Sequence, residues 1–232
     1  MNKANEGLSN VMNRFEISPE ILAANERIEK EQEETEKQRR KEQIQEMRKA
    51  VLESFPLRFR NSSFDNYELD ADKNIREKQE YLIWKLREGV SLIMYGKNGT
   101  GKTRLAFASM RDKVLKGQSV KYMTASEFFD EIKLTFNNTI KVSDVLGKYL
   151  HYDNLFIDEV DKTYGTVTEF IALFRLIDKR YLDLKPTVLI ANATKENVID
   201  VIGRSSYERI VEDGTAILMD WESYRAKNRV NK

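Results

Sequence analysis

A glycine-rich loop at residues 96–103, with the sequence GKNGTGKT, constrains the fold of this chain more than any other feature. It directly follows the apolar run 91–95 (SLIMY) and opens a segment with helical spacing that extends to about Leu115. Glycines in a strand–loop–helix turn of this kind let backbone N–H groups point at a phosphate, which the helix N-terminus also attracts. We therefore predict a phosphate-binding site made of Gly96, Lys97, Asn98, Gly99, Thr100, Gly101, Lys102 and Thr103.

The last two residues of the loop have separate predicted roles. Lys102 is expected to contact the β- and γ-phosphates of ATP as a charge, and the Thr103 hydroxyl is expected to bind Mg²⁺. The alternative is a glycine turn before an unrelated helix. The apolar strand directly before the loop favours the phosphate-binding interpretation over this alternative. The loop therefore predicts ATP and Mg²⁺ as cofactors.

Two adjacent carboxylates end a second apolar strand, whose sequence NLFIDE covers residues 154–159. Asp158 is suited to hold Mg²⁺ through the water shell of the ion. Glu159 points to a different side and is suited to orient and deprotonate an attacking water molecule. Carboxylates also end many strands for no chemical reason, but this pair lies where a phosphate loop of this kind needs it. We predict a catalytic pair that hydrolyses ATP.

The run 187–192 (TVLIAN) is a further strand candidate that ends in an amide, Asn192. An amide between the phosphate loop and the acidic pair is suited to bind the γ-phosphate and the attacking water, and so to distinguish ATP from ADP. The alternative is an ordinary turn residue, because Asn is favoured in turns. The position favours the first interpretation.

Apolar runs alternate with segments of helical spacing from Phe64 onward, which predicts a parallel sheet covered by helices on both faces. The expected fold is α/β with a five-stranded parallel sheet. Its predicted strands are 91–95, 120–123, 155–157, 188–191 and 217–219. Its predicted helices are 102–115, 126–136 and 170–182.

The composition changes near Pro56, and we divide the chain into an extension, 1–55, and a domain, 56–232. Residues 26–49 are almost wholly Glu, Gln, Lys and Arg, with favourable i,i+4 pairs and no continuous heptad seam, which predicts a solvated single helix. The first residues carry apolar side chains too few to form a core. They are interpreted either as a docking element for a partner or as a frayed tail that packs on the main domain.

Composition excludes several chemistries. There is no cysteine and only one histidine, so thiolate zinc sites and thiol catalysis are not expected. The formal net charge is +1, so no overall positive electrostatic field that would attract nucleic acid is expected. The histidine, His151, is interpreted as ordinary. No signal peptide and no membrane-length apolar run is recognisable, so the protein is expected to be cytoplasmic.

The region from about Pro56 onward resembles the DnaC-type replicative helicase loaders, which are AAA+ P-loop ATPases and include phage proteins. The resemblance rests on the loop, the acidic pair, the Asn192 strand and three further sequences: FDNY at 64–67, YERI at 207–210 and WESYR at 221–225. The last is the most specific, because P-loop proteins in general lack it.

The resemblance implies roles for two arginines and a DNA contact. Arg209 would be a finger that reaches the ATP of a neighbouring subunit, which requires self-association through the ATP sites. A surface ion pair with Glu208 or Glu212 is the alternative. Arg225 would contact nucleotide in its own subunit. Lys133 and Phe136 would contact single-stranded DNA, although the spacing of Phe136 suits a core residue equally well.

The expected function is therefore to load a DnaB-type replicative helicase hexamer onto single-stranded DNA. ATP binding and slow hydrolysis would control DNA grip and helicase release. Some loaders carry an N-terminal zinc domain, which a chain without cysteines cannot form, so helicase docking is assigned to the extension by position alone.

The alternative is a transposition helper ATPase of the IstB type, which shares the core and would bind duplex DNA. A third possibility is a binding protein that uses nucleotide only for stability.

Overall fold

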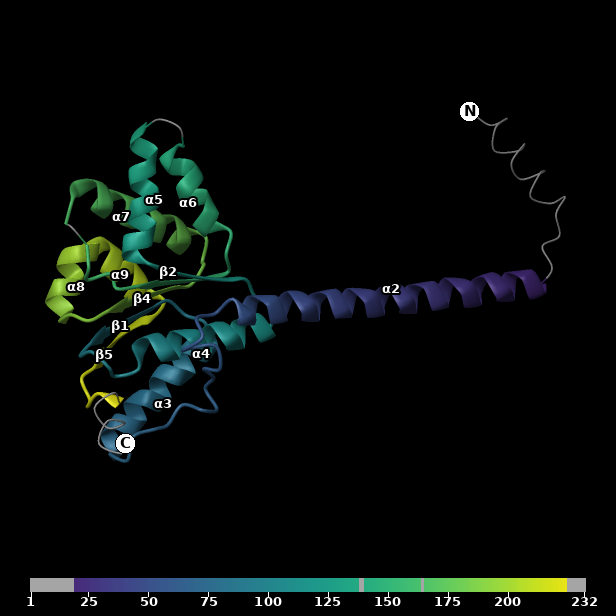
Figure 1. Cartoon of the computed structure of the whole chain (residues 1–232), viewed down its shortest axis with the longest axis horizontal. Helices are drawn as coiled ribbons and strands as arrows, with labels where there is room; N and C mark the ends of the chain where they lie inside the picture. The colour runs from purple at the N-terminus through teal and green to yellow at the C-terminus, as the bar shows by residue number, and fades with distance from the viewer. Residues whose placement is uncertain (1–18, 138–139, 164, 225–232) are drawn as a thin grey trace. The chain divides into compact units, whose positions relative to one another are not determined.

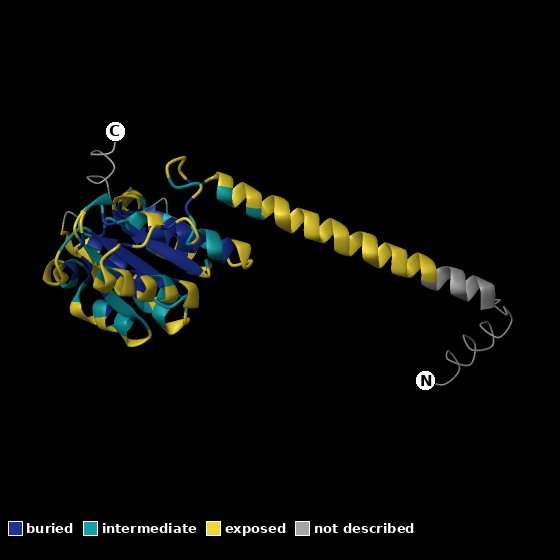
Figure 2. Cartoon of the chain, turned by 90° about the horizontal axis from the view of Figure 1, so that it is seen from below, coloured by how far each residue is buried: buried dark blue, intermediate teal, exposed yellow. Residues whose placement is uncertain are grey.

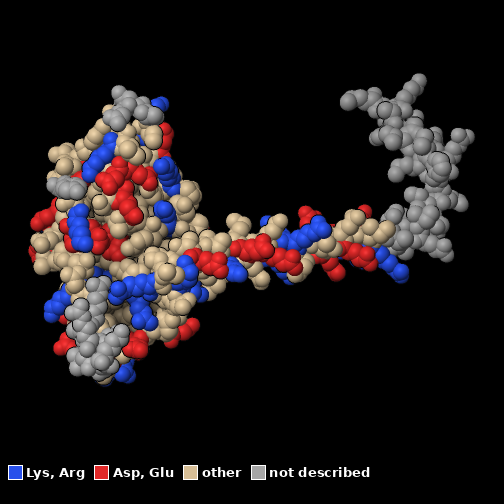
Figure 3. Space-filling model, in the orientation of Figure 1, with Lys and Arg blue, Asp and Glu red and all other residues tan. Residues whose placement is uncertain are grey.

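The computed structural model describes residues 19–137, 140–163 and 165–224, with side chains from residue 27 onward. By its internal contacts the chain divides into two units, residues 1–50 and 51–232. Of the first unit, the structure describes the part formed by α2 (Pro19–Glu53), a helix of 35 residues. From Arg27 to Ala50 its side chains are exposed except that of Arg48, which is half-buried (Figure 2). Charges of both signs alternate along it (Figure 3), as predicted for a solvated helix.

The second unit contains a five-stranded parallel sheet in the order β2-β3-β4-β1-β5 (Figure 1). Its strands are β1 (Leu92–Gly96), β2 (Val120–Thr124), β3 (Asn154–Asp158), β4 (Thr187–Ala191) and β5 (Thr215–Met219). The α/β fold with five parallel strands is confirmed. Each predicted strand is present and differs from its prediction by at most two residues at either end.

Helices cover both faces of the sheet and bury two apolar clusters. On one face, α3 (Lys73–Glu88) and α4 (Lys102–Leu115) pack on strand residues such as Met94 and Ile190. The other face carries α5 (Ala125–Leu134), α6 (Val142–Leu150), α7 (Val167–Leu182), α8 (Lys195–Ile202) and α9 (Arg204–Glu212). The helix predicted over 126–136 ends at Leu134 and continues as a 3-10 turn, η1 (Thr135–Asn137).

A fully buried arginine, Arg180 at the end of α7, holds the amino ends of β3 and β4 together. Its guanidinium donates to four backbone carbonyls at 2.7–3.2 Å and, through Nε, to the Thr187 hydroxyl at 3.0 Å. These carbonyls belong to Tyr149, Tyr152, Asp153 and Pro186. Burial lowers the pKa of Arg180 to about 10, so the side chain stays charged at neutral pH.

We expect Arg180→Met to destabilise the protein by about 2–4 kcal/mol. The substitution leaves buried carbonyls without donors, and this cost exceeds the gain from removing a desolvated charge. Denaturant unfolding measures this loss. Arg175→Met is the matched control, since Arg175 lies exposed on the same helix. Equal unfolding midpoints for the two variants would contradict this role of Arg180.

Candidate functional site

The phosphate loop joins β1 to α4, and each of its three glycines has a backbone angle that favours glycine. The φ angles are 123° at Gly96, 80° at Gly99 and 97° at Gly101. The left-handed region is open to glycine at little cost, which explains this residue type at these positions. Lys102 is 5% exposed, and its Nζ donates to the carbonyls of Gly96 at 3.0 Å and Lys97 at 2.6 Å. The loop carbonyls thus hold the buried ammonium group of Lys102 within the loop.

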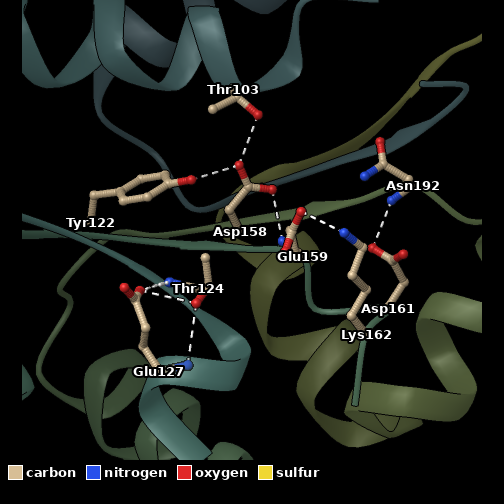
Figure 4. A network of polar contacts seen from close by, with 9 residues as sticks. All are labelled: Thr103, Tyr122, Thr124, Glu127, Asp158, Glu159, Asp161, Lys162 and Asn192. Carbon is tan, nitrogen blue, oxygen red and sulfur yellow. Dashed lines mark hydrogen bonds and ion pairs between the residues drawn. The ribbon is translucent and has the colours of Figure 1, made fainter. Parts of the chain in front are cut away.

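Asp158 at the end of β3 lies against the start of α4 (Figure 4). Its Oδ2 accepts hydrogen bonds from the Thr103 hydroxyl at 2.8 Å and from the Tyr122 phenol at 2.9 Å. Burial raises the pKa of Asp158, and these donors oppose that rise by stabilising the carboxylate. The two residues predicted to bind Mg²⁺ are therefore in direct contact.

Tyr122, on β2, was not predicted as part of the site. Burial and the Asp158 carboxylate raise its pKa, so the phenol remains a hydrogen-bond donor. In the sequence, this contact is indicated only by the position of Tyr122, two residues before the end of β2, the strand that pairs with β3.

Glu159 follows Asp158 with a φ of 57°, in the left-handed region that is costly for a residue with a side chain. Its backbone N–H donates to Asp158 Oδ1 at 2.7 Å, which fixes the turn. Its carboxylate forms an ion pair with Lys162 at 2.6 Å (Figure 4). The two carboxylates consequently have different surroundings: Asp158 is buried at the helix, while Glu159 is partly exposed beside a lysine.

Asn192 directly follows β4, which lies between β3 and β1 in the sheet. The strand order therefore places it between the acidic pair and the phosphate loop. Its backbone N–H donates to Asp161 Oδ1 at 2.8 Å, which ties the turn after β4 to the turn after β3 (Figure 4).

Of the two arginines with predicted roles, the structure describes Arg209 but not Arg225. Arg209 on α9 forms an ion pair with Asp178 of α7 at 2.9 Å and not with Glu208 or Glu212, the partners that the surface-pair alternative named. Its guanidinium also lies 5.3 Å from the ring centre of Phe174. Arg225 lies outside the described residues, as do apolar residues of the proposed docking element before residue 19.

The predicted DNA contacts lie at the end of α5 and in η1. Phe136 is 62% exposed, so the alternative that it is a core residue is wrong. Lys133 forms a surface ion pair with Asp130 at 3.1 Å. Phe129 and Ile132, at helical spacing before Phe136, are buried in the core instead.

The parallel sheet, the phosphate loop and the acidic strand end together define a P-loop protein with the AAA+ fold. The profile of the family described as "IstB-like ATP binding protein" matches residues 7–232, and the chain belongs to this family.

Relatives with assigned functions are similar over most of the chain. The replicative helicase loader DnaC of Escherichia coli (strain K12) is 27% identical over 172 residues, which cover 72% of this chain and 70% of DnaC. The replicative helicase loader DnaC of Buchnera aphidicola subsp. Schizaphis graminum is 26% identical over 225 residues, covering 94% and 90% of the two chains.

A solved structure supports the fold. The crystal structure of the DnaC helicase loader superimposes with a TM-score of 0.58 and 18% identity, covering 70% of this chain and 99% of that one. Among the helices in the described part of the chain, none combines the length and the apolar character that crossing a membrane requires.

Proposed function

We propose that this chain is an ATP-dependent loader of a replicative ring helicase. The observation that carries the proposal is the phosphate loop, the acidic pair and Asn192 at the carboxyl ends of β1, β3 and β4, in a chain that is similar over 94% of its length to a protein named replicative helicase loader. The partner would be a DnaB-type hexamer, and the loader would act on single-stranded DNA in the cytoplasm.

In this proposal the chain binds ATP with Mg²⁺ and hydrolyses it. Lys102 would hold the β- and γ-phosphates, and Thr103 and Asp158 would hold the metal, the carboxylate through the water shell of the ion. The donor set fits, because a hydroxyl and a buried carboxylate in contact at 2.8 Å are hard oxygen ligands of the kind that Mg²⁺ takes. The described residues contain no group of three or more His, Cys, Asp or Glu side chains for a different metal site.

The remaining residues have roles in turnover and assembly. Glu159 would activate the attacking water, and Asn192 would sense the γ-phosphate. Arg209 would reach the ATP of a neighbouring copy, and Arg225 would contact nucleotide in its own subunit. ATP would act as a switch between DNA grip, through Lys133 and Phe136, and helicase release.

The extension at 1–55 is proposed to dock on the helicase, and the domain at 56–232 to contain the ATPase. We expect the full chain to form a complex with the replicative helicase of the same source, measured by light scattering, and a version that starts at Val51 to form none. The truncation starts at Val51 because Phe55 is buried in the second unit, so removing it would damage that unit.

The same pair of proteins distinguishes the main alternative. The family description also fits an IstB-type transposition helper ATPase, which would bind duplex DNA. If neither version binds the helicase, with or without ATP, and the full chain prefers duplex over single-stranded DNA, the loader proposal is wrong and the transposition function replaces it.

A further inference from the structure

The last residue of β5 and the segment that follows it lie along the phosphate loop and form hydrogen bonds with it. We call residues 219–224 the strap. Lys97 N–H donates to Met219 O at 3.1 Å, at one end of the loop. Trp221 Nε1 donates to Thr100 O at 3.0 Å, and the Tyr224 backbone N–H donates to Gly99 O at 3.0 Å. The strap thus contacts the loop at three separate points.

These bonds fix how the loop presents its own donors. In a trans peptide the C=O and the following N–H point in opposite directions. Holding the carbonyls of Gly99 and Thr100 on the strap therefore turns the N–H groups of Thr100 and Gly101 away from it. At the other end, the N–H of Lys97 is held on the strap and the carbonyl of Gly96 accepts from the Lys102 ammonium. The strap accounts for the orientation of these three peptide units.

The strap is itself firmly held. Trp221 is 3% exposed and belongs to the apolar cluster beneath α3 and α4. The Tyr224 hydroxyl accepts from Gln79 Nε2 at 2.7 Å and donates to the Glu68 carbonyl at 3.2 Å. Ser223 packs so close to Gly99 that a Cβ at that glycine would overlap its side chain. These contacts give a structural reason for Trp221, Ser223 and Tyr224, to which the proposed function assigns no role.

We propose that Trp221 is a positioning residue for the phosphate loop, acting through the Thr100 carbonyl, so that the strap senses whether the loop holds a phosphate. This inference rests on the proposed binding of ATP. It concerns the β-phosphate, which ATP and ADP share, because loop N–H groups at a helix N-terminus are the groups that contact it.

The test is Trp221→Phe, which keeps an apolar ring in the core and removes the indole N–H. We expect the Kd values for ATP and for ADP to rise together by about 3- to 10-fold, the effect of one net hydrogen bond. The weaker binding of AMP, which lacks a β-phosphate, should not change. Trp84→Phe is the control, because Trp84 is 49% exposed on α3 and should leave all three affinities unchanged. Calorimetric titration gives the affinities, and thermal unfolding checks that each variant is folded.

The outcomes separate the two proposals. If the unaltered protein binds neither ATP nor ADP, the proposed function fails. If the unaltered protein binds them and folded Trp221→Phe binds equally well, only the strap inference fails.

A second measurement does not depend on the folding of Trp221→Phe. The chain has two tryptophans, so Trp221 is the sole tryptophan of Trp84→Phe. Its emission should change when MgADP saturates the site and stay the same with AMP. An unchanged spectrum at saturating MgADP overturns the inference.

Discussion

Replacement of Arg209 by alanine should reduce the ATP hydrolysis rate of the assembled protein by about 10³–10⁵-fold, because a guanidinium on the γ-phosphate stabilises the charge of the transition state. ATP binding by isolated subunits should be unchanged. In the single chain Arg209 is paired with Asp178 at 2.9 Å, and both side chains are less than a third exposed. Steady-state turnover at saturating MgATP and equilibrium binding of ATP measure the two parts of this prediction.

Two controls distinguish a finger from a structural ion pair. Asp178→Asn removes the charge partner and keeps Arg209, so it should retain most of the activity; a loss as large as that of Arg209→Ala would identify the pair itself as the cause. Arg204→Ala alters an exposed arginine on the same helix and should behave as the unaltered protein.

Mixing variants tests whether Arg209 acts between subunits. Arg209→Ala retains its own ATP site, and Lys102→Ala retains Arg209. If the finger acts in trans, a mixture of these two inactive variants should regain part of the activity, because some neighbours then supply what the other lacks. Mixtures that stay inactive while still co-assembling would refute action in trans.

Local motifs made much of this site predictable from the sequence. The phosphate loop and the acidic pair are contiguous residues after short apolar runs, and parallel strands bring their carboxyl ends to one edge of a sheet. Contacts between distant segments were not predictable in this way. The Tyr122–Asp158 bond depends on the register of β2 with β3, and the Trp221–Thr100 bond joins residues far apart in the chain.

Helix α3 is absent from the predicted helices for a different reason. Only Gln79, Leu82 and Leu86 are buried in it, so its apolar stripe is narrow and interrupted by charges. The signals that were present are at its ends. Asp72 caps the N-terminus by accepting from the N–H groups of residues 74 and 75, and Gly89 ends the helix with a φ of 77°.

The second large effect is expected at Glu159. Glu159→Gln should bind MgATP with near-normal affinity and hydrolyse it about 10²–10⁴-fold more slowly, because the amide cannot accept the proton of the attacking water. The substitution keeps the size of the side chain and the backbone N–H that donates to Asp158. Single-turnover hydrolysis with enzyme in excess, together with ATP binding, measures both quantities. Hydrolysis at the unaltered rate would remove Glu159 from the mechanism.

The ion pair with Lys162 provides the matched control for this prediction. The pairing holds Glu159 through a surface contact at 2.6 Å, and it raises the pKa of Lys162 through the neighbouring carboxylate. If Lys162 only orients the resting carboxylate, Lys162→Met should leave hydrolysis within about tenfold of the unaltered rate, since an exposed ion pair contributes little. A loss equal to that of Glu159→Gln would instead show that the pair acts as a unit. Lys102→Ala completes the series, because it should abolish ATP binding, whereas Glu159→Gln should abolish only the chemical step.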